Sequence, residues 1–358
     1  MGNDTMIESS NILEEVDNST QWLSDNAKHV TINLPSIDQF IQDLQQDDYK
    51  SKSSAVNFPL NFSDHQQEIN FWFILDLINI GSGFRKELHD ASNRGAYETI
   101  CYGLFGMFLS QSGNLSAKFL SNMSLHEVSS YFGIPVSVEV QQQVGIYTYK
   151  DSSLKPLAIH IHQILRESAR ILGELGYNDF GAMVLKVTDP ARPDSAANSA
   201  ALLVQRLVST FPAFADRHTC GGQTIHIYKK AQLLCADLYR RFKVDLPERF
   251  AFKDIDSLTV FSDNVLPAVL RKYGILTLST ELAEWVDAGK ELPPGEQEVE
   301  LRAVAVHACR LIVNRAHSID ANHFIGNQVT LDYFLWTKGK DNGFRQAERH
   351  YTKQTIFY

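Results

Sequence analysis

The sequence predicts a mainly α-helical protein that forms a single domain with a few short accessory strands. Apolar residues recur at helical spacing over residues 157–177, 227–239 and 296–315, so each stretch has a face that a helix would bury. β-branched and aromatic residues gather at residues 29–34 and 145–149, which predicts two short strands. Helices should therefore build most of the core.

Residues 63–81 predict one well-delimited helix. A Ser-Asp-His-Gln capping pattern opens it, an apolar run follows, and Gly81 offers a left-handed residue where the helix can stop. The stretch 188–198 is rich in proline and small residues and predicts a long surface loop. Helical spacing resumes at Ala200 without a change in composition, so we interpret this loop as part of one domain.

The beginning of the chain predicts a disordered tail. Residues 1–20 are polar and acidic without periodic apolar positions, so we expect the domain to occupy 21–358. The tail has neither the apolar core of a signal peptide nor an Arg-rich targeting pattern. The four cysteines lie far apart and match no zinc or disulfide framework. We therefore expect a cytoplasmic protein outside the membrane, with its oligomeric state left open.

The charge of the chain bears on its partner. The net charge is −9 at pH 7, whereas binding to a phosphate backbone depends on clustered Lys and Arg. The composition thus favours a small-molecule substrate and argues against a direct nucleic-acid partner. The histidines have no companion Cys, Asp or Glu at recurrent ligand spacing, and the common phosphate-loop and nucleophile motifs are missing from the sequence. We predict neither a metal nor an organic cofactor.

Two polar side chains, Asp76 and Asn79, lie three residues apart on one face of the apolar helix predicted at 63–81. A buried carboxylate needs hydrogen bonds or a cation, because otherwise it becomes protonated or destabilises the fold. Two interpretations stay open for Asp76. It is either a structural carboxylate that caps a helix or pairs with an arginine, or a carboxylate in the wall of a pocket.

Asp216 and Asp263 each lie in a loop just ahead of a predicted helix, and the first of these helices carries Lys229. Loops held by rigid helices often carry chemistry, but Asp is also a preferred residue for capping a helix. Both carboxylates are therefore candidates for a site and for caps. Lys229 could bind a phosphate or be a solvated surface residue.

Six motifs occur in a characteristic order and spacing: HVTIN (29–33), NFWFILDLIN (70–79), FPAFAD (211–216), YKKAQ (228–232), FSD (261–263) and LDYFLW (331–336). With them the chain resembles the queuosine salvage protein family from about Trp22 to its end. The resemblance implies a helical domain distantly similar to helical DNA glycosylases. It also implies hydrolysis of the N-glycosidic bond of queuosine 5′-phosphate, which releases queuine for salvage into tRNA modification without a cofactor.

The resemblance also implies roles for individual residues. Asp216 would be the catalytic carboxylate. Seven further positions would contact the substrate: Phe214, Asp76, Asn79, Asp263, Lys229, His65 and Asp332. The last three of these lie within or beside matching motifs and could equally support the fold.

The chemistry sets requirements for such a site. Cleavage of an N-glycosidic bond builds positive charge on the sugar ring, which a fixed carboxylate stabilises. Asp216 could act electrostatically, attack C1′ or position a water. Queuine is a 7-deazaguanine without the N7 atom that ordinary purines protonate, so a second acid or an ordered water is needed. Its cationic amine suits Asp76 and Asp263, Phe214 could stack on the base, and Lys229 could bind the phosphate.

Two other functions stay open. A glycosylase that acts on nucleic acid would fit a helical protein with a base-binding pocket, but the chain has no basic stripe. A non-catalytic module that binds a nucleobase or a partner protein would leave the acidic residues as helix caps. Release of a base from a nucleotide distinguishes the three.

Overall fold

The computed structural model describes residues 11–53 and 59–358. Helices dominate it, which confirms the predicted class. The α-helices are α1 (Ile12–Asn26), α2 (Leu34–Asp43), α3 (Gln46–Lys52), α4 (His65–Leu77), α5 (Arg85–Ser92), α6 (Ala96–Ser110), α7 (Ala117–Asn122), α8 (Leu125–Phe132), α9 (Lys155–Glu174), α10 (Phe180–Val187), α11 (Ala200–Thr210), α12 (Lys229–Phe242), α13 (Pro247–Phe250), α14 (Val265–Lys272), α15 (Thr280–Asp287), α16 (Glu296–Ile319), α17 (Gln328–Lys338) and α18 (Asn342–Arg345). Short 3-10 helices are η1 (Ser82–Phe84), η2 (Pro212–Phe214) and η3 (Ile255–Ser257).

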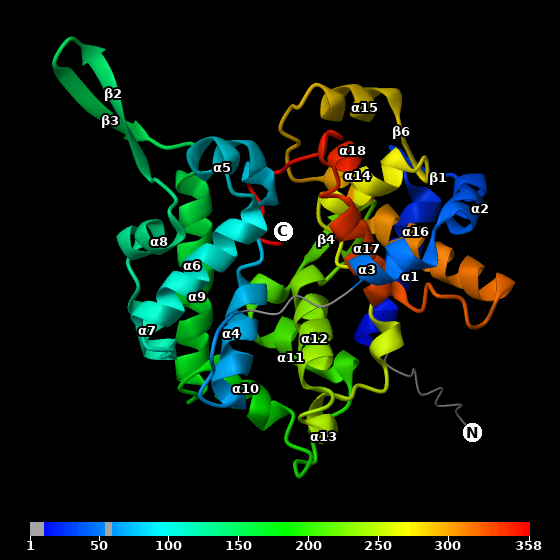
Figure 1. Cartoon of the computed structure of the whole chain (residues 1–358), viewed down its shortest axis with the longest axis horizontal. Coiled ribbons are helices and arrows are strands. Elements are labelled where there is room, and N and C mark those ends of the chain that lie inside the picture. The colour runs from blue at the N-terminus through cyan, green and yellow to red at the C-terminus, as the bar shows by residue number, and fades with distance from the viewer. Residues whose placement is uncertain (1–10, 54–58) are drawn as a thin grey trace, which may run out of the picture.

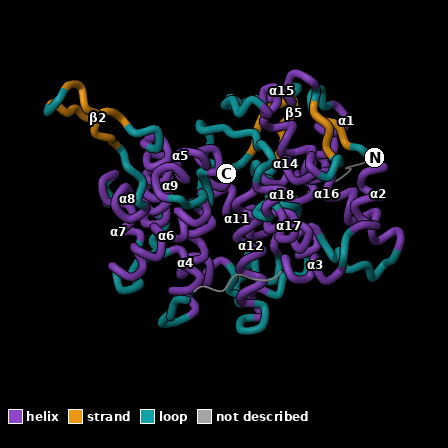
Figure 2. Tube along the Cα trace, turned by 45° about the horizontal axis from the view of Figure 1, so that its top comes forward, coloured by secondary structure: helices purple, strands orange, loops and turns teal. Residues whose placement is uncertain are grey.

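The strands form small antiparallel pairs at the periphery (Figure 2). They are β1 (Val30–Ile32) with β6 (Leu276–Leu278), β2 (Ser137–Gln143) with β3 (Ile146–Asp151), and β4 (Arg217–Cys220) with β5 (Gln223–His226). The two predicted strands are confirmed as β1 and β3. Their partners and the β4–β5 pair were not predicted, because strands of three to seven residues carry too few alternating positions.

The helices gather in two groups (Figure 1). One contains α4 to α10 and carries the projecting β2–β3 hairpin, and the other contains α1 to α3 and α14 to α18. Helices α11 and α12 lie between the groups, and α12 packs against α4. One cluster of buried apolar residues runs through both groups. The predicted likeness of the whole fold to helical DNA glycosylases stays a prediction. None of the helices in the described ranges is long and apolar enough to span a membrane.

The prediction of a tail over residues 1–20 is wrong for its second half. Helix α1 begins at Ile12, where the Asn11 side chain accepts the Leu13 N–H and caps it. Leu13 and Val16 are buried, and α1 packs along α16. Leu13, Val16 and Leu23 form one buried face of α1, but the polar residues between them obscure this spacing in the sequence. Residues 1–10 lie outside the described part of the chain.

Helix α4 is the central element of the fold. Asp64 caps it by accepting the Gln67 N–H at 2.8 Å, and every residue from 68 to 77 is buried. A helix buried on all sides must satisfy any polar group within the protein. It ends at Leu77, four residues before the predicted stop. Gly81 then adopts a φ of 99° and opens η1, which turns the chain away and leaves Asp76 and Asn79 at the helix end.

Candidate active site

A cavity of about 250 Å³ lies where the two helical groups meet. The ends of α4, α5 and α6 contribute one side, and α12, α17 and the segment 261–265 contribute the other. Tyr358, at the end of the chain, also lines it. The cavity holds an unusual number of ionisable side chains for a buried space, which is typical of a functional site.

The structure brings five of the eight predicted site residues together. The cavity is lined by Asp76, Asn79, Lys229, Asp263 and Asp332. Three predicted residues lie elsewhere. His65 is exposed at the opposite end of α4, and Phe214 packs its ring 5.5 Å from that of Phe73 inside the core. Asp216 is fully buried behind the cavity wall.

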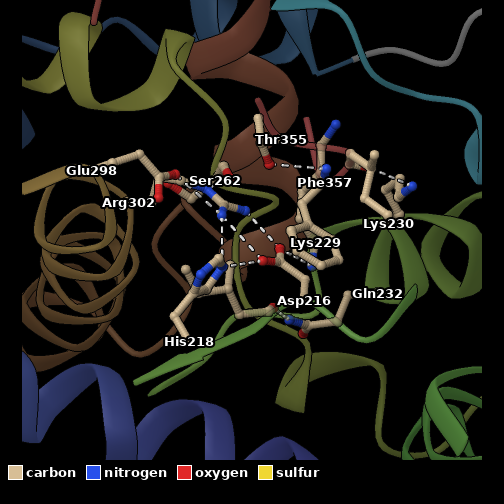
Figure 3. A network of polar contacts seen from close by, with 12 residues as sticks. Asp216, His218, Lys229, Lys230, Gln232, Ser262, Glu298, Arg302, Thr355 and Phe357 are labelled. Carbon is tan, nitrogen blue, oxygen red and sulfur yellow. Dashed lines mark hydrogen bonds and ion pairs between the residues drawn. The ribbon is translucent and has the colours of Figure 1, made fainter. Parts of the chain in front are cut away.

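Asp216 forms the centre of a buried polar network (Figure 3). One carboxylate oxygen accepts a hydrogen bond from Arg302 at 2.6 Å and from the Lys229 backbone N–H at 3.3 Å. The other accepts one from Arg302 at 3.1 Å and lies 2.8 Å from the His218 ring. Burial alone would raise the pKa of Asp216, but the guanidinium of Arg302 and the His218 ring hold it below its usual value. Asp216 is thus an ionised cap at the start of α12.

The same network reaches the cavity. The Arg302 Nε donates to the Ser262 carbonyl at 3.0 Å, directly beside Asp263. The Asp216 carbonyl accepts the N–H groups of Ile227 and Tyr228, which fixes the residues that precede Lys229. Tyr228 itself has a left-handed φ of 48°, a conformation that a large residue keeps only under strong constraint. The Asp216 to Arg302 pair therefore positions two residues of the site.

Lys229 enters the cavity from the first turn of α12. Its Nζ donates to the side-chain and backbone oxygens of Asn79 at 2.8 and 3.0 Å. Burial lowers its pKa, and the Asp263 carboxylate opposes this effect. Asp263 accepts the Val265 N–H at 2.6 Å through one oxygen and so also caps α14. Asp263 thus caps α14 and also lines the cavity, and its role as a site residue stays a prediction.

Asp332 supplies a protonated carboxyl group beside Asp263. It is buried on α17 and accepts the Phe261 N–H at 2.7 Å. Burial raises its pKa to about 8, and the nearby Asp263 charge adds to this, whereas the Phe261 N–H acts against it. At neutral pH Asp332 is therefore mainly a neutral acid that lines the cavity.

A second pair of acids lies further along α4 and α12. Burial raises the pKa of Asp76 well above its usual range, and the nearby Asp237 adds to the effect. Asp237 forms an ion pair with Arg240 at 2.8 Å and accepts a hydrogen bond from the Tyr333 hydroxyl at 3.2 Å. Sequence analysis missed these three partners. A signal was present, since Asp237 lies on the helix predicted over 227–239, Arg240 follows it directly, and Tyr333 lies inside the LDYFLW motif.

Three arginines, Arg85, Arg345 and Arg349, line another part of the cavity. Burial lowers the pKa of Arg349 to about 10, and Arg85 adds to this through repulsion. The buried Nε of Arg349 has no hydrogen-bond partner. This part of the cavity is therefore suited to an anion. Among the described residues, no group of His, Cys, Asp and Glu side chains is arranged to hold a metal ion.

Comparison with known proteins shows which family the chain belongs to. The family model described as queuosine salvage protein matches residues 58–358. The chain belongs to the queuosine salvage protein family. Three similar proteins are each named queuosine 5′-phosphate N-glycosylase/hydrolase. The Sphaerobacter thermophilus protein is 32% identical over 57% of this chain and 58% of its own length. The Nematostella vectensis protein is 25% identical over 86% and 88%, and the Dictyostelium discoideum protein is 24% identical over 97% and 100%.

Arg302→Met tests how this queuosine salvage protein holds its site together. Removing one partner of a buried ion pair leaves Asp216 uncompensated, so we expect a loss of about 3–5 kcal/mol in the free energy of unfolding. Urea denaturation measures it. Arg315 pairs with Asp38 on the surface, with both side chains about half exposed. Arg315→Met should cost no more than about 1 kcal/mol. Equal losses for both variants would contradict the role of the Asp216 to Arg302 pair.

Asp332→Asn tests the raised pKa. The folded value of about 8 lies above the unfolded value of about 3.9, so the neutral carboxyl stabilises the fold at low pH. This stabilisation is complete below about pH 4 and falls by up to about 1.4 kcal/mol per pH unit until about pH 8. The amide mimics the neutral acid at every pH. Urea midpoints between pH 5 and 8 should fall faster for the parent than for the variant, and parallel profiles would refute the assignment.

Proposed function

We propose that this protein hydrolyses the N-glycosidic bond of queuosine 5′-phosphate and releases queuine. The observation that carries the proposal is a cavity, in a member of this family, where a neutral acid and a second carboxylate lie side by side. Asp332 has a pKa raised to about 8, and Asp263 faces the cation of Lys229. Glycosidic hydrolysis needs this combination of a proton donor and a charge-stabilising carboxylate.

Asp263 is proposed as the group that stabilises the sugar. As the C1′–N bond breaks, its electron pair goes to the base and positive charge develops on the sugar ring. Asp263 has one oxygen fixed by the Val265 N–H, which holds the carboxylate in place in the cavity wall. A fixed charge that needs no reorganisation is the most effective form of such stabilisation. A water then adds to C1′ and gives its proton to a carboxylate of the site.

Asp332 is proposed as the acid that assists the leaving base. Queuine has no N7 atom, so the base must receive its proton at another atom, and a carboxyl group protonated near neutral pH supplies it. Because the acid works in its protonated form, activity should fall as the pH rises above about 8. The Phe261 N–H holds the Asp332 side chain in position while the cavity leaves it accessible.

Asp216 is proposed to act through its neighbours. The family resemblance implies that Asp216 is the catalytic carboxylate, and this role stays a prediction. Both of its oxygens, however, are taken up by Arg302, His218 and the Lys229 N–H. Since it does not line the cavity, we assign it the positioning of Lys229 and Asp263 instead. A cytoplasmic location and the lack of direct nucleic-acid contact stay predictions.

Release of queuine from queuosine 5′-phosphate, followed by chromatography and mass spectrometry, tests the function. Asp263→Asn and Asp332→Asn should each lower kcat by about 10²–10³ without unfolding the protein, because each amide keeps the backbone hydrogen bond. Asp216→Asn should lower stability and activity together. Asp47→Asn on the exposed face of α3 is the matched control. A folded parent that releases no queuine would refute the function, and a fully active Asp263→Asn would refute the site.

The 5′-phosphate is proposed to bind at Arg85, Arg345 and Arg349. The sequence favours Lys229 for this role, but Lys229 is held by Asn79 and faces Asp263, which would repel a phosphate. An anion among the arginines would relieve their mutual repulsion and supply a partner for the buried Arg349 Nε.

Arg349→Met tests this placement, and Arg345→Met, at a more exposed position, does so with less risk to the fold. We expect KM for queuosine 5′-phosphate to rise about tenfold or more through loss of a charge-assisted hydrogen bond. Hydrolysis of the nucleoside queuosine should change little. Lys86→Met, a neighbouring surface cation outside the cavity, serves as the control. A loss of equal size with nucleotide and nucleoside would overturn the placement.

A further inference from the structure

Asp76 is a buried carboxylate that its surroundings leave unsatisfied. It is 1% exposed on α4, and its Oδ2 has no hydrogen-bond partner. Its side chain makes no ion pair within the described part of the chain, although it lines the cavity. Native proteins pair nearly all buried polar atoms, so an unpaired carboxylate oxygen beside an open cavity indicates a missing ligand.

The groups around Asp76 define the charge of that ligand. Asp237 lies close enough to repel it, and Arg240 is bound directly to Asp237 at 2.8 Å. Arg240 also attracts Asp76, but its ion pair is with Asp237, so it neutralises only one of the two carboxylates. Lys229 attracts Asp76 only weakly, because its ammonium is held by Asn79 and faces Asp263. The cluster as a whole lacks one positive charge.

Two states can relieve this deficit. In one, the two acids share a proton, which agrees with the raised pKa of both Asp76 and Asp237. In the other, a cation enters from the cavity and both acids ionise. An amine is favoured over a metal ion, because Arg240 and the Tyr333 hydroxyl already occupy Asp237 and only Asp76 is free to bind. An ammonium needs few ligands, so a single free carboxylate can bind it through a charge-assisted hydrogen bond.

We propose that Asp76, supported by Asp237 and Arg240, is a recognition site for a single cationic amine on the base of the substrate. This inference rests on the proposed function and adds a selection rule to it. The enzyme should prefer nucleotides whose base carries a protonated amine, as queuine does, over nucleotides with an uncharged base of the same shape. Asp263 and Asp332 then act at the glycosidic bond, and Asp76 acts at the distant amine.

The test compares queuosine 5′-phosphate with an analogue in which an ether oxygen replaces the amine nitrogen. The analogue keeps the shape and removes the charge. We expect the parent protein to prefer the amine about ten- to hundredfold in kcat/KM, as for a charge-assisted hydrogen bond. Asp76→Asn should abolish this preference by lowering kcat/KM for the amine alone. Asp237→Asn should reverse it, because Arg240 is then left without its partner and repels a cation.

Controls separate the outcomes. Asp76→Asn replaces an unpaired buried acid by a neutral amide, so its urea midpoint should equal or exceed that of the parent. Asp47→Asn should retain the full preference for the amine. If the parent hydrolyses neither nucleotide, the proposed function fails. If it hydrolyses both equally, or if Asp76→Asn keeps the preference or lowers both rates alike, the function stands and the amine site is overturned.

Discussion

The buried pair between Asp216 and Arg302 is the interaction on which the rest of the site depends. Asp216 precedes β4, Arg302 lies in the second turn of α16, and both side chains are fully buried. Between them they bind the start of α12 and the Ser262 carbonyl. A buried ion pair contributes little net stability compared with an apolar pair, so its main effect here is to fix the positions of the groups that it binds. It fixes two loops that the hydrophobic core alone would leave free to shift.

That geometry allows several aspartates to lie together in one buried cavity, an arrangement that would otherwise destabilise the fold. Four buried aspartates line one cavity, and burial raises the pKa of three of them, Asp76, Asp237 and Asp332. Each lies on a helix or is tied to a backbone N–H, so none can turn into solvent. Such groups destabilise the protein and are retained where chemistry or recognition requires them. Asp216 differs from them, because Arg302 and His218 lower its pKa, and this difference supports the positioning role proposed for it.

The sequence predicts much of this fold because local patterns decide it. Helix α4, the loop 188–198 and helix α12 follow from capping residues, breakers and helical spacing. Contacts between residues far apart in the sequence cannot be predicted from such local patterns. Asp216 precedes a helix and can be read as a cap or as a catalyst, and only its contact with Arg302, 86 residues away, decides which geometry it adopts. Asp237 was missed for the same reason, because its role depends on its closeness to Asp76 on another helix.

The end of the chain completes the site. The Tyr358 carbonyl accepts the Gly81 N–H, and its ring lies 4.6 Å from the Arg302 guanidinium. Lys230 donates to the carbonyls of Leu77 and Ile356, and so joins the end of α4 to this segment. The cavity wall therefore combines three separate stretches of the chain, 76–98, 229–265 and 332–358. Burying its acids requires these distant stretches to pack together, and the burial of the apolar core offsets the cost.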